Sequence, residues 1–260
     1  MLSSERRNRI VKALRVDGSA SVRQLAVTLE VSESTIRRDL QLLDRNGELS
    51  RTYGGAMLPP GATVEEFGRS GHEGRFLLDA DADAPLKRAV AETAAELVRD
   101  GDVVILDIGT TTPPLARRLA GREITVITTN LAVFDELRDD EAVRLILLGG
   151  VVRRNYRSLV GSIAERALSE VSADIVFLSC TGVRPNGHVV DNMAVEAPIK
   201  RSMISAAERV VLLASERKFP GTGALRLCSL AEVDTVISTP GAPTETLDLC
   251  RNAGGEVLIA

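Results

Sequence analysis

The chain has 260 residues, of which 44% are hydrophobic, and its formal net charge at pH 7 is -4. This length exceeds the usual span of one compact domain, so we expect two domains. No apolar run is as long as a membrane span, and the N-terminal stretch lacks the apolar segment of an export signal, so we expect a cytoplasmic protein without membrane contact. Three cysteines without CxxC spacing argue against a zinc site and a disulfide framework, and we expect no metal or cofactor.

The average charge hides a basic N-terminal part. Residues 1–58 contain ten Lys and Arg against seven Asp and Glu, a net charge of +3, and the rest of the chain carries 22 against 29, a net charge of -7. Such an asymmetry indicates a nucleic-acid surface on an otherwise acidic body. The alternative is a solvated helical face.

Three helices are expected in this basic part. Apolar side chains at helical spacing predict the first over residues 3–16. The second is expected in SVRQLAVTLE (residues 21–30), with Ser21 as its N-cap, and the third follows a tight turn, over about residues 32–45. Two short helices joined by a turn form a helix-turn-helix arrangement.

The third helix has one apolar face and polar side chains in its first turns. Ile36, Leu40 and Leu43 lie at the spacing of a buried face, and Asp39 either orients an arginine or forms an ion pair on the core side. The N-terminal part of such a helix enters the major groove, where arginine can bond guanine with two parallel hydrogen bonds. Hydroxyl groups there contact phosphates or bases. The expected DNA contacts in this helix are Ser32, Ser34, Thr35, Arg37 and Arg38.

A short β-hairpin is expected in GELSRTYGGAML (residues 47–58), which has strand-like alternation and a Gly-Gly turn. Such a hairpin forms a wing beside the helix-turn-helix. Arg51 and Tyr53 lie near its tip and are expected to contact the phosphate backbone or the minor groove. For Arg51 the alternative is a solvated loop residue.

Beyond residue 84, short apolar runs alternate with helical patterns. The runs are GDVVILDIG, EITVITTN, VRLILLGG, ADIVFLSCTG, RVVLLAS, VDTVIST and GEVLIA. This alternation predicts an open, mainly parallel α/β sheet. We therefore expect a winged helix-turn-helix DNA-binding domain (residues 1–58), a Gly- and Pro-rich linker (residues 59–84) and an α/β domain for effector binding and oligomerisation (residues 85–260).

Small and polar residues follow several of these strands, and open α/β sheets bind ligands at the carboxyl ends of their strands. DIGTTT (residues 107–112) favours an anion because its strand-to-helix turn has free backbone N–H groups, whereas the lack of Walker A and GxGxxG motifs disfavours ATP and dinucleotides. Each turn alone is more often an ordinary turn, and Glu196 and Lys200 alone would be an exposed i, i+4 pair. The expected effector contacts are Asp107, Gly109, Thr110, Thr111, Thr112, Thr128, Asn130, Gly149, Gly150, Arg153, Gly182, Asp191, Glu196, Lys200 and Lys218.

Several of these stretches resemble one protein family. RNRIVKAL, VRQLA, STIRRDLQLL and RTYGGA are similar to the winged helix of the DeoR family of bacterial transcriptional repressors, and DIGTTT, ITTN, LLGG, LVG, GHVVDNMAVEAPIKRSMI and LLASERKF resemble its C-terminal effector domain. The resemblance implies that the first domain binds an operator with residues 34–43 as its reader. It also implies a second domain that is related in fold to ribose-5-phosphate isomerase and senses a small phosphorylated sugar or sugar derivative. The sequence departs from the family at Ala214, where an Asp is common.

Two functions remain in competition. The first is a DNA-binding repressor of carbohydrate metabolism genes, a homodimer or homotetramer on double-stranded operator DNA, which a phosphorylated sugar releases. The alternative is a sugar-phosphate isomerase-like enzyme that carries a DNA-binding domain, with acid and base groups among Asp191, Glu196 and Lys200. The chain has no recognisable nucleophile-and-base pair and lacks the glycine-rich lysine motif of the isomerases, so no enzyme is expected. Activation in place of repression stays open.

Overall fold

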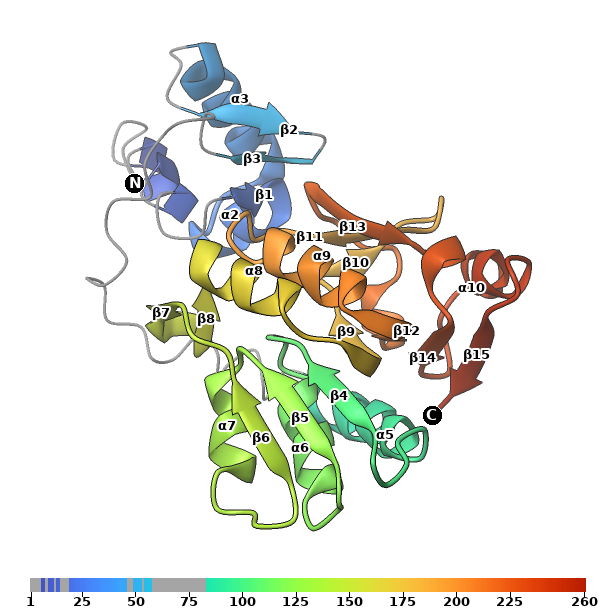
Figure 1. Ribbon diagram of the computed structural model, residues 1–260. Helices are drawn as coiled ribbons and strands as arrows, with labels where there is room; N and C mark the ends of the chain where they lie inside the picture. Colours follow the sequence, from blue (N-terminus) through green and yellow to red (C-terminus); the bar gives the residue numbers. More distant parts are fainter. Residues whose placement is uncertain are drawn as a thin grey trace.

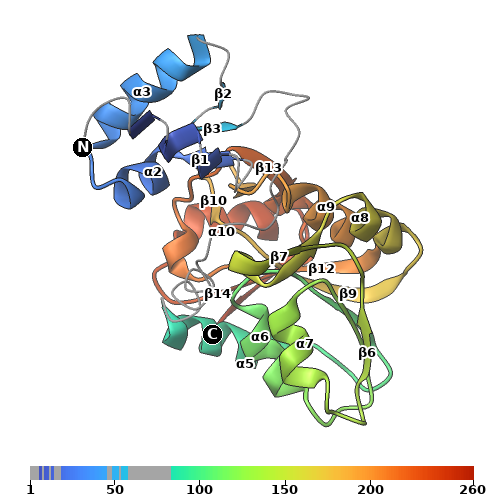
Figure 2. The same cartoon turned by 90° about the vertical axis from the view of Figure 1, so that its left-hand side faces the viewer.

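The computed structural model describes residues 6–7, 9–11, 13–14, 19–45, 49–52, 54–57 and 83–260. These residues form a small N-terminal unit, blue in Figure 1, and a larger α/β unit. Figure 2 shows the same two units from the side. In the described part of the chain, no helix combines the length and the apolar character needed to cross a bilayer. The expected linker lies almost wholly outside the described residues.

The N-terminal unit packs helices and a small sheet around one apolar cluster. Ser21 is the N-cap of α2 (Val22–Thr28) and forms a capping box with Gln24: the N–H of each residue donates to the side chain of the other. α3 (Glu33–Arg45) buries Ile36, Leu40 and Leu43, as its periodicity predicted. β1 (Ser19–Ser21), β3 (Gly55–Met57) and β2 (Ser50–Thr52) form an antiparallel sheet in the order β1-β3-β2, so the expected wing hairpin is confirmed.

The larger unit is built on a seven-stranded parallel sheet in the order β15-β14-β12-β9-β4-β5-β6. Each strand comes from one of the seven apolar runs, so the predicted fold class is confirmed. The strands are β4 (Val103–Leu106), β5 (Thr125–Thr128), β6 (Arg144–Leu147), β9 (Ala173–Ser179), β12 (Ala207–Leu213), β14 (Thr235–Ser238) and β15 (Glu256–Ile259). The chain builds outward from β4 to β6 and then returns to the other side of β4 with β9. The strand order therefore reverses between β4 and β9.

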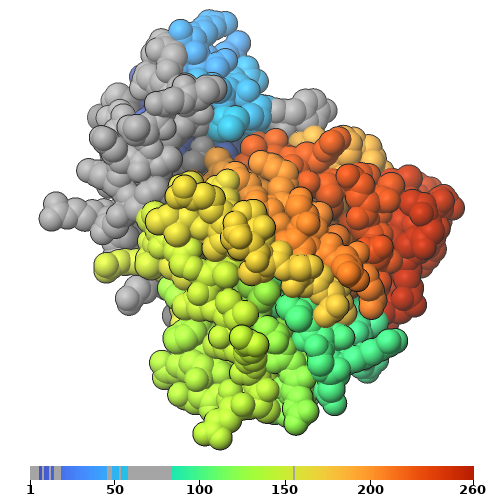
Figure 3. All heavy atoms as spheres, viewed as in Figure 1, coloured from blue at the N-terminus to red at the C-terminus, as the bar shows by residue number. Residues whose placement is uncertain are grey.

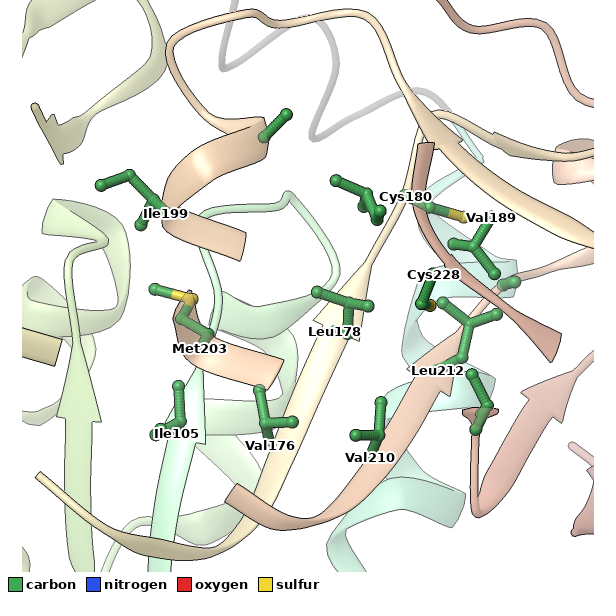
Figure 4. Close-up of a cluster of buried hydrophobic side chains, with 14 of the residues drawn as sticks. Ile105, Val176, Leu178, Cys180, Val189, Ile199, Met203, Val210, Leu212 and Cys228 are labelled. Atoms are coloured by element: carbon green, nitrogen blue, oxygen red, sulfur yellow. The ribbon is translucent and has the colours of Figure 1, made fainter. Parts of the chain in front are cut away.

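Helices cover both faces of this sheet, because its strands are apolar on both sides. α5 (Ala84–Ala95), α6 (Thr112–Leu119) and α7 (Leu131–Leu137) pack on one face. α8 (Ser162–Ser169), α9 (Ala197–Ser205) and α10 (Thr244–Arg251) pack on the other. Figure 4 shows the second core, where Leu178, Met203 and Leu212 bring β9, α9 and β12 together.

Two smaller antiparallel sheets were not expected from the sequence. β7 (Val151–Arg153) pairs with β8 (Ser158–Val160), and β11 (His188–Asp191) pairs with both β10 (Gly182–Val183) and β13 (Leu225–Ser229). Most of these strands are only two to four residues long, too short for a recognisable alternation. β11 ends at Asp191, one of the residues expected to contact an effector.

Candidate functional site

A cavity of about 350 Å³ opens at the carboxyl ends of β4, β9 and β12. It lies where the strand order reverses, the usual place for a ligand in an open α/β sheet. The lining residues are Gln24, Asp83, Lys87, Val90, Ile108, Gly109, Thr110, Thr111, Tyr156, Ser179, Cys180, Thr181, Asp191, Met193, Glu196, Lys200, Leu213, Ser215 and Lys218.

Asp107 joins the two central strands beneath this cavity. Its carboxylate is fully buried and accepts hydrogen bonds from the N–H of Gly109 and the N–H of Ser179, both at 2.8 Å. The Ser179 hydroxyl donates to the same carboxylate at 2.9 Å. A β-carbon on Gly109 would lie 1.8 Å from the Ser179 hydroxyl oxygen, so a side chain at residue 109 would disrupt this turn.

Lys200 forms the buried centre of the charged cluster. Its Nζ lies 2.9 Å from Asp191 Oδ2 and 3.3 Å from Asp107 Oδ2, and it donates to the Ser179 carbonyl at 3.0 Å. Burial alone would lower the pKa of Lys200, but Asp191 and Asp107 raise it above its usual value. Burial alone would likewise raise the pKa of Asp191, but Lys200 brings it below its usual value. Lys200 and Asp191 are therefore both ionised, and the interpretation of Lys200 as an exposed helix residue is wrong.

Glu196 pairs with Arg153 and not with Lys200. Arg153 Nη1 donates to Glu196 Oε1, and the two residues are only 5% and 6% exposed. The guanidinium of Arg153 also lies over the ring of Tyr156, 4.3 Å from its centroid. Burial raises the pKa of Glu196 to about 7, although Arg153 opposes the shift. Glu196 therefore gains or loses its proton near neutral pH.

The cavity also carries groups suited to an anion. Lys218, on the 3-10 helix η2 (Glu216–Lys218), is half-buried, and it forms no ion pair with any described residue. The turn with Thr110 and Thr111 leads directly into α6. Cys180 contributes no charge, because burial raises the pKa of its thiol to about 11.

The cavity brings together seven of the expected effector contacts: Gly109, Thr110, Thr111, Asp191, Glu196, Lys200 and Lys218. Eight others lie outside its lining: Asp107, Thr112, Thr128, Asn130, Gly149, Gly150, Arg153 and Gly182. Several of these residues lie beneath the lining and hold its turns in place through hydrogen bonds. The Asn130 amide, for example, caps α7 and donates to the carbonyl of Asp107 at 3.2 Å and to the Thr112 hydroxyl at 3.2 Å.

Sequence reasoning missed lining residues that come from elements with no ligand motif. Gln24 belongs to the N-terminal unit, and Lys87 is one position in an amphipathic helix. Thr181 belongs to the small polar turn at residues 181–182 that the sequence singled out, although only Gly182 was expected to contact the effector. Only the folded chain shows that these side chains meet. Within the described residues, no group of His, Cys, Asp and Glu side chains is arranged to hold a metal ion.

The predicted DNA contacts form the exposed start of α3. Ser34, Arg37 and Arg38 are exposed, and Arg37 donates to Glu33 one turn earlier at 2.8 Å. Asp39 is 7% exposed and binds Arg6 at 2.5 Å, so of its two predicted roles the structure supports the core-side ion pair.

The remaining predicted DNA contacts lie at the start of α3 and in the wing. The Ser32 hydroxyl lies 2.8 Å from that of Thr35. The side chain of Arg51 is exposed on β2, and Tyr53 lies outside the described residues.

Both parts of the chain match known family models. Residues 6–60 match the DeoR-like helix-turn-helix domain, and residues 83–239 match the DeoR C terminal sensor domain. HTH-type transcriptional repressor GlcR of Bacillus subtilis is 33% identical, covering 100% of this chain and 97% of that protein. HTH-type transcriptional regulator GlpR of Haloferax volcanii is 30% identical (99% and 98% covered), and the L-fucose operon activator of Haemophilus influenzae is 29% identical (93% and 94% covered). Ribose 5-phosphate isomerase A of Methanocaldococcus jannaschii aligns with a TM-score of 0.40 and 21% identity, over 52% of this chain and 54% of that one.

Proposed function

Because the chain belongs to the DeoR family of transcriptional regulators, we propose that it is a repressor of carbohydrate metabolism genes that a phosphorylated sugar releases from operator DNA. The observation that carries this proposal is the cavity at the strand reversal. It combines a lysine that pairs with no described residue with buried carboxylates and hydroxyl groups. Its volume of about 350 Å³ suits one small, polar molecule.

Each end of a sugar phosphate has suitable partners in this cavity. Lys218 and the N–H groups around Thr110 and Thr111 would bind the phosphate, since a compact ammonium and a strand-to-helix turn both favour an anion. Asp191 and Glu196 would accept hydrogen bonds from sugar hydroxyls. Lys200 would hold the two carboxylates at its sides in place and would not itself contact the phosphate.

Operator recognition is assigned to the exposed start of α3 and to the wing. Arg37 and Arg38 would read bases, and Ser32, Ser34, Thr35, Arg51 and Tyr53 would contact phosphates or bases. One such module has limited contact area, so we propose a homodimer or homotetramer that places two modules on two half-sites. This activity also places the protein in the cytoplasm. We keep the division into a DNA-binding domain (residues 1–58), a linker (59–84) and an effector and oligomerisation domain (85–260).

We do not propose an enzyme. Each acid–base candidate is engaged in a buried ion pair: Lys200 pairs with Asp191 and Asp107, and Glu196 pairs with Arg153. Names of relatives support both a repressor, GlcR, and an activator, the L-fucose operon activator. We propose repression because a repressor can be released simply: when the effector binds, it shifts the arrangement of the winged helices, and they no longer fit the operator.

Calorimetric titration of the full chain with ribose 5-phosphate, fructose 6-phosphate, glucose 6-phosphate and inorganic phosphate tests the sensor site. We expect at least one sugar phosphate to bind, and we expect Lys218→Met to weaken that binding roughly tenfold or more, as for a hydrogen bond to a charged group. Arg251→Met is the matched control, because Arg251 is an exposed cation on α10 that pairs with Asp248 and lies outside the cavity lining. Equal affinities for the wild type and Lys218→Met would refute the assigned phosphate site.

A further inference from the structure

α2 of the winged helix lies against the sensor cavity. Figure 2 shows this helix close to β10, and Figure 3 shows the two units in contact. A second hollow, of about 260 Å³, lies between them: Arg23, Gln24 and Thr28 line it from α2, and Thr181, Asn192 and Thr222 line it from the α/β unit. Gln24 and Thr181 line the sensor cavity as well, so the two hollows share a wall.

Asp191 and Asn192 connect the two hollows through the backbone. Asp191 lines the sensor cavity, and the next residue, Asn192, lines the hollow under α2. The N–H of Asn192 donates to Asp191 Oδ1 at 2.7 Å, and the Thr181 hydroxyl donates to the same oxygen at 3.3 Å. Asn192 is 1% exposed, and its Oδ1 has no hydrogen-bond partner among the described residues. A buried acceptor without a partner is costly, and the residue that carries this one lines the hollow under α2.

The side-chain amide of Gln24 uses its oxygen, Oε1, in a hydrogen bond, whereas its nitrogen, Nε2, is available as a donor. Its Oε1 accepts from the N–H of Ser21 at 3.1 Å and lies 3.2 Å from the Ser21 hydroxyl, which completes the capping box of α2. No hydrogen bond of Gln24 Nε2 with any described residue is found. The side chain is half-buried and lines the sensor cavity, so its NH₂ group is a donor at the edge of the proposed ligand site.

We propose that Gln24, a residue of the DNA-binding unit, is a ligand-contacting residue of the sensor site, and that it donates a hydrogen bond from Nε2 to a phosphate or hydroxyl oxygen of the effector. This inference rests on the proposed function. A ligand that bonds both Gln24 and the strand ends of the α/β unit binds one arrangement of the two units better than the others. It therefore shifts the population of those arrangements, and α2 passes the shift to α3, against which it packs.

Gln24→Glu tests the contact without removing the helix cap. In a glutamate, a carboxylate oxygen replaces the amide oxygen of Gln24 as the acceptor for the Ser21 N–H, since both Glu and Gln serve at this position of a capping box. It replaces the NH₂ donor by a negative oxygen, which repels an anionic ligand. We expect the affinity for the sugar phosphate that the wild type binds to fall roughly tenfold or more. Gln41→Glu, the same change at an exposed position of α3, is the control and should leave this affinity unchanged.

Hydrogen exchange in the full chain gives an independent readout. The bound sugar phosphate should slow amide exchange in α2 (Val22–Thr28) as well as in the strand-end turns of the α/β unit. Protection confined to residues 83–260, together with a Gln24→Glu affinity within twofold of the wild type, would overturn the inference and leave the sensor site standing. If none of the four compounds binds the wild type, the proposed function itself fails, and this inference fails with it.

Discussion

Replacing Lys200 by methionine tests whether the charged cluster is organised as described. The residue is 3% exposed, and its ammonium lies between the carboxylates of Asp191 and Asp107. Lys200→Met keeps most of the volume but leaves two buried carboxylates without a cation. Removal of one partner of a buried ion pair costs about 3–5 kcal/mol. An exposed i, i+4 pair, the alternative that the sequence alone allowed, would cost at most about 0.5 kcal/mol.

Urea unfolding at several pH values measures this difference. In the wild type, the lowered pKa of Asp191 contributes stability that is present above the pKa of the unfolded chain and is lost only as the pH falls through the folded pKa. In Lys200→Met, burial without a cation favours the protonated carboxyl, so the loss of stability should be smaller at pH 5 than at pH 8. The double variant Lys200→Met/Asp191→Asn should recover part of it. A single variant within about 0.5 kcal/mol of the wild type at every pH would refute the cluster.

Two further predictions concern the DNA-reading helix and Glu196. Arg38→Ala should weaken operator binding by about 1–3 kcal/mol and binding to unrelated DNA by less. Arg45→Ala, the same change at the far end of α3, is the control and should affect both affinities equally. Anisotropy titrations at one salt concentration measure the two affinities. The raised pKa of Glu196 means that the folded protein holds a proton which the unfolded chain releases, so wild-type stability should fall by up to about 3 kcal/mol between pH 4.5 and about 7. Glu196→Gln should remove this slope in urea unfolding, and an unchanged slope would assign it to another group.

Periodicity and turn chemistry predicted most of the fold. The N-cap at Ser21, the buried face of α3 and all seven strands of the parallel sheet are confirmed, because each depends on local sequence. Family membership is confirmed as well, by residues in both parts of the chain. The short antiparallel strands were missed, since two to four residues carry too little alternation.

Seven cavity residues were expected from the sequence, some from a strand-end motif and some as charged candidates, but their partners were not. Gly109, Thr110 and Thr111 lie in the turn that follows β4, and the structure places them in the cavity. Glu196 and Lys200 are four residues apart, about one helical turn, and their spacing could not show that they pair with different residues. Gln24 lies more than 80 residues before β4 ends, and no local pattern connects it with that strand.

The most direct test of the account is the affinity of the purified protein for DNA upstream of its own gene, titrated at fixed salt with a sugar phosphate that calorimetry shows to bind. We predict that the compound weakens operator binding by the wild type. Lys218→Met should still bind the operator but should need a correspondingly higher concentration of the compound for release. Operator affinity that stays the same while the sugar phosphate is demonstrably bound would contradict the claim that this cavity controls DNA binding.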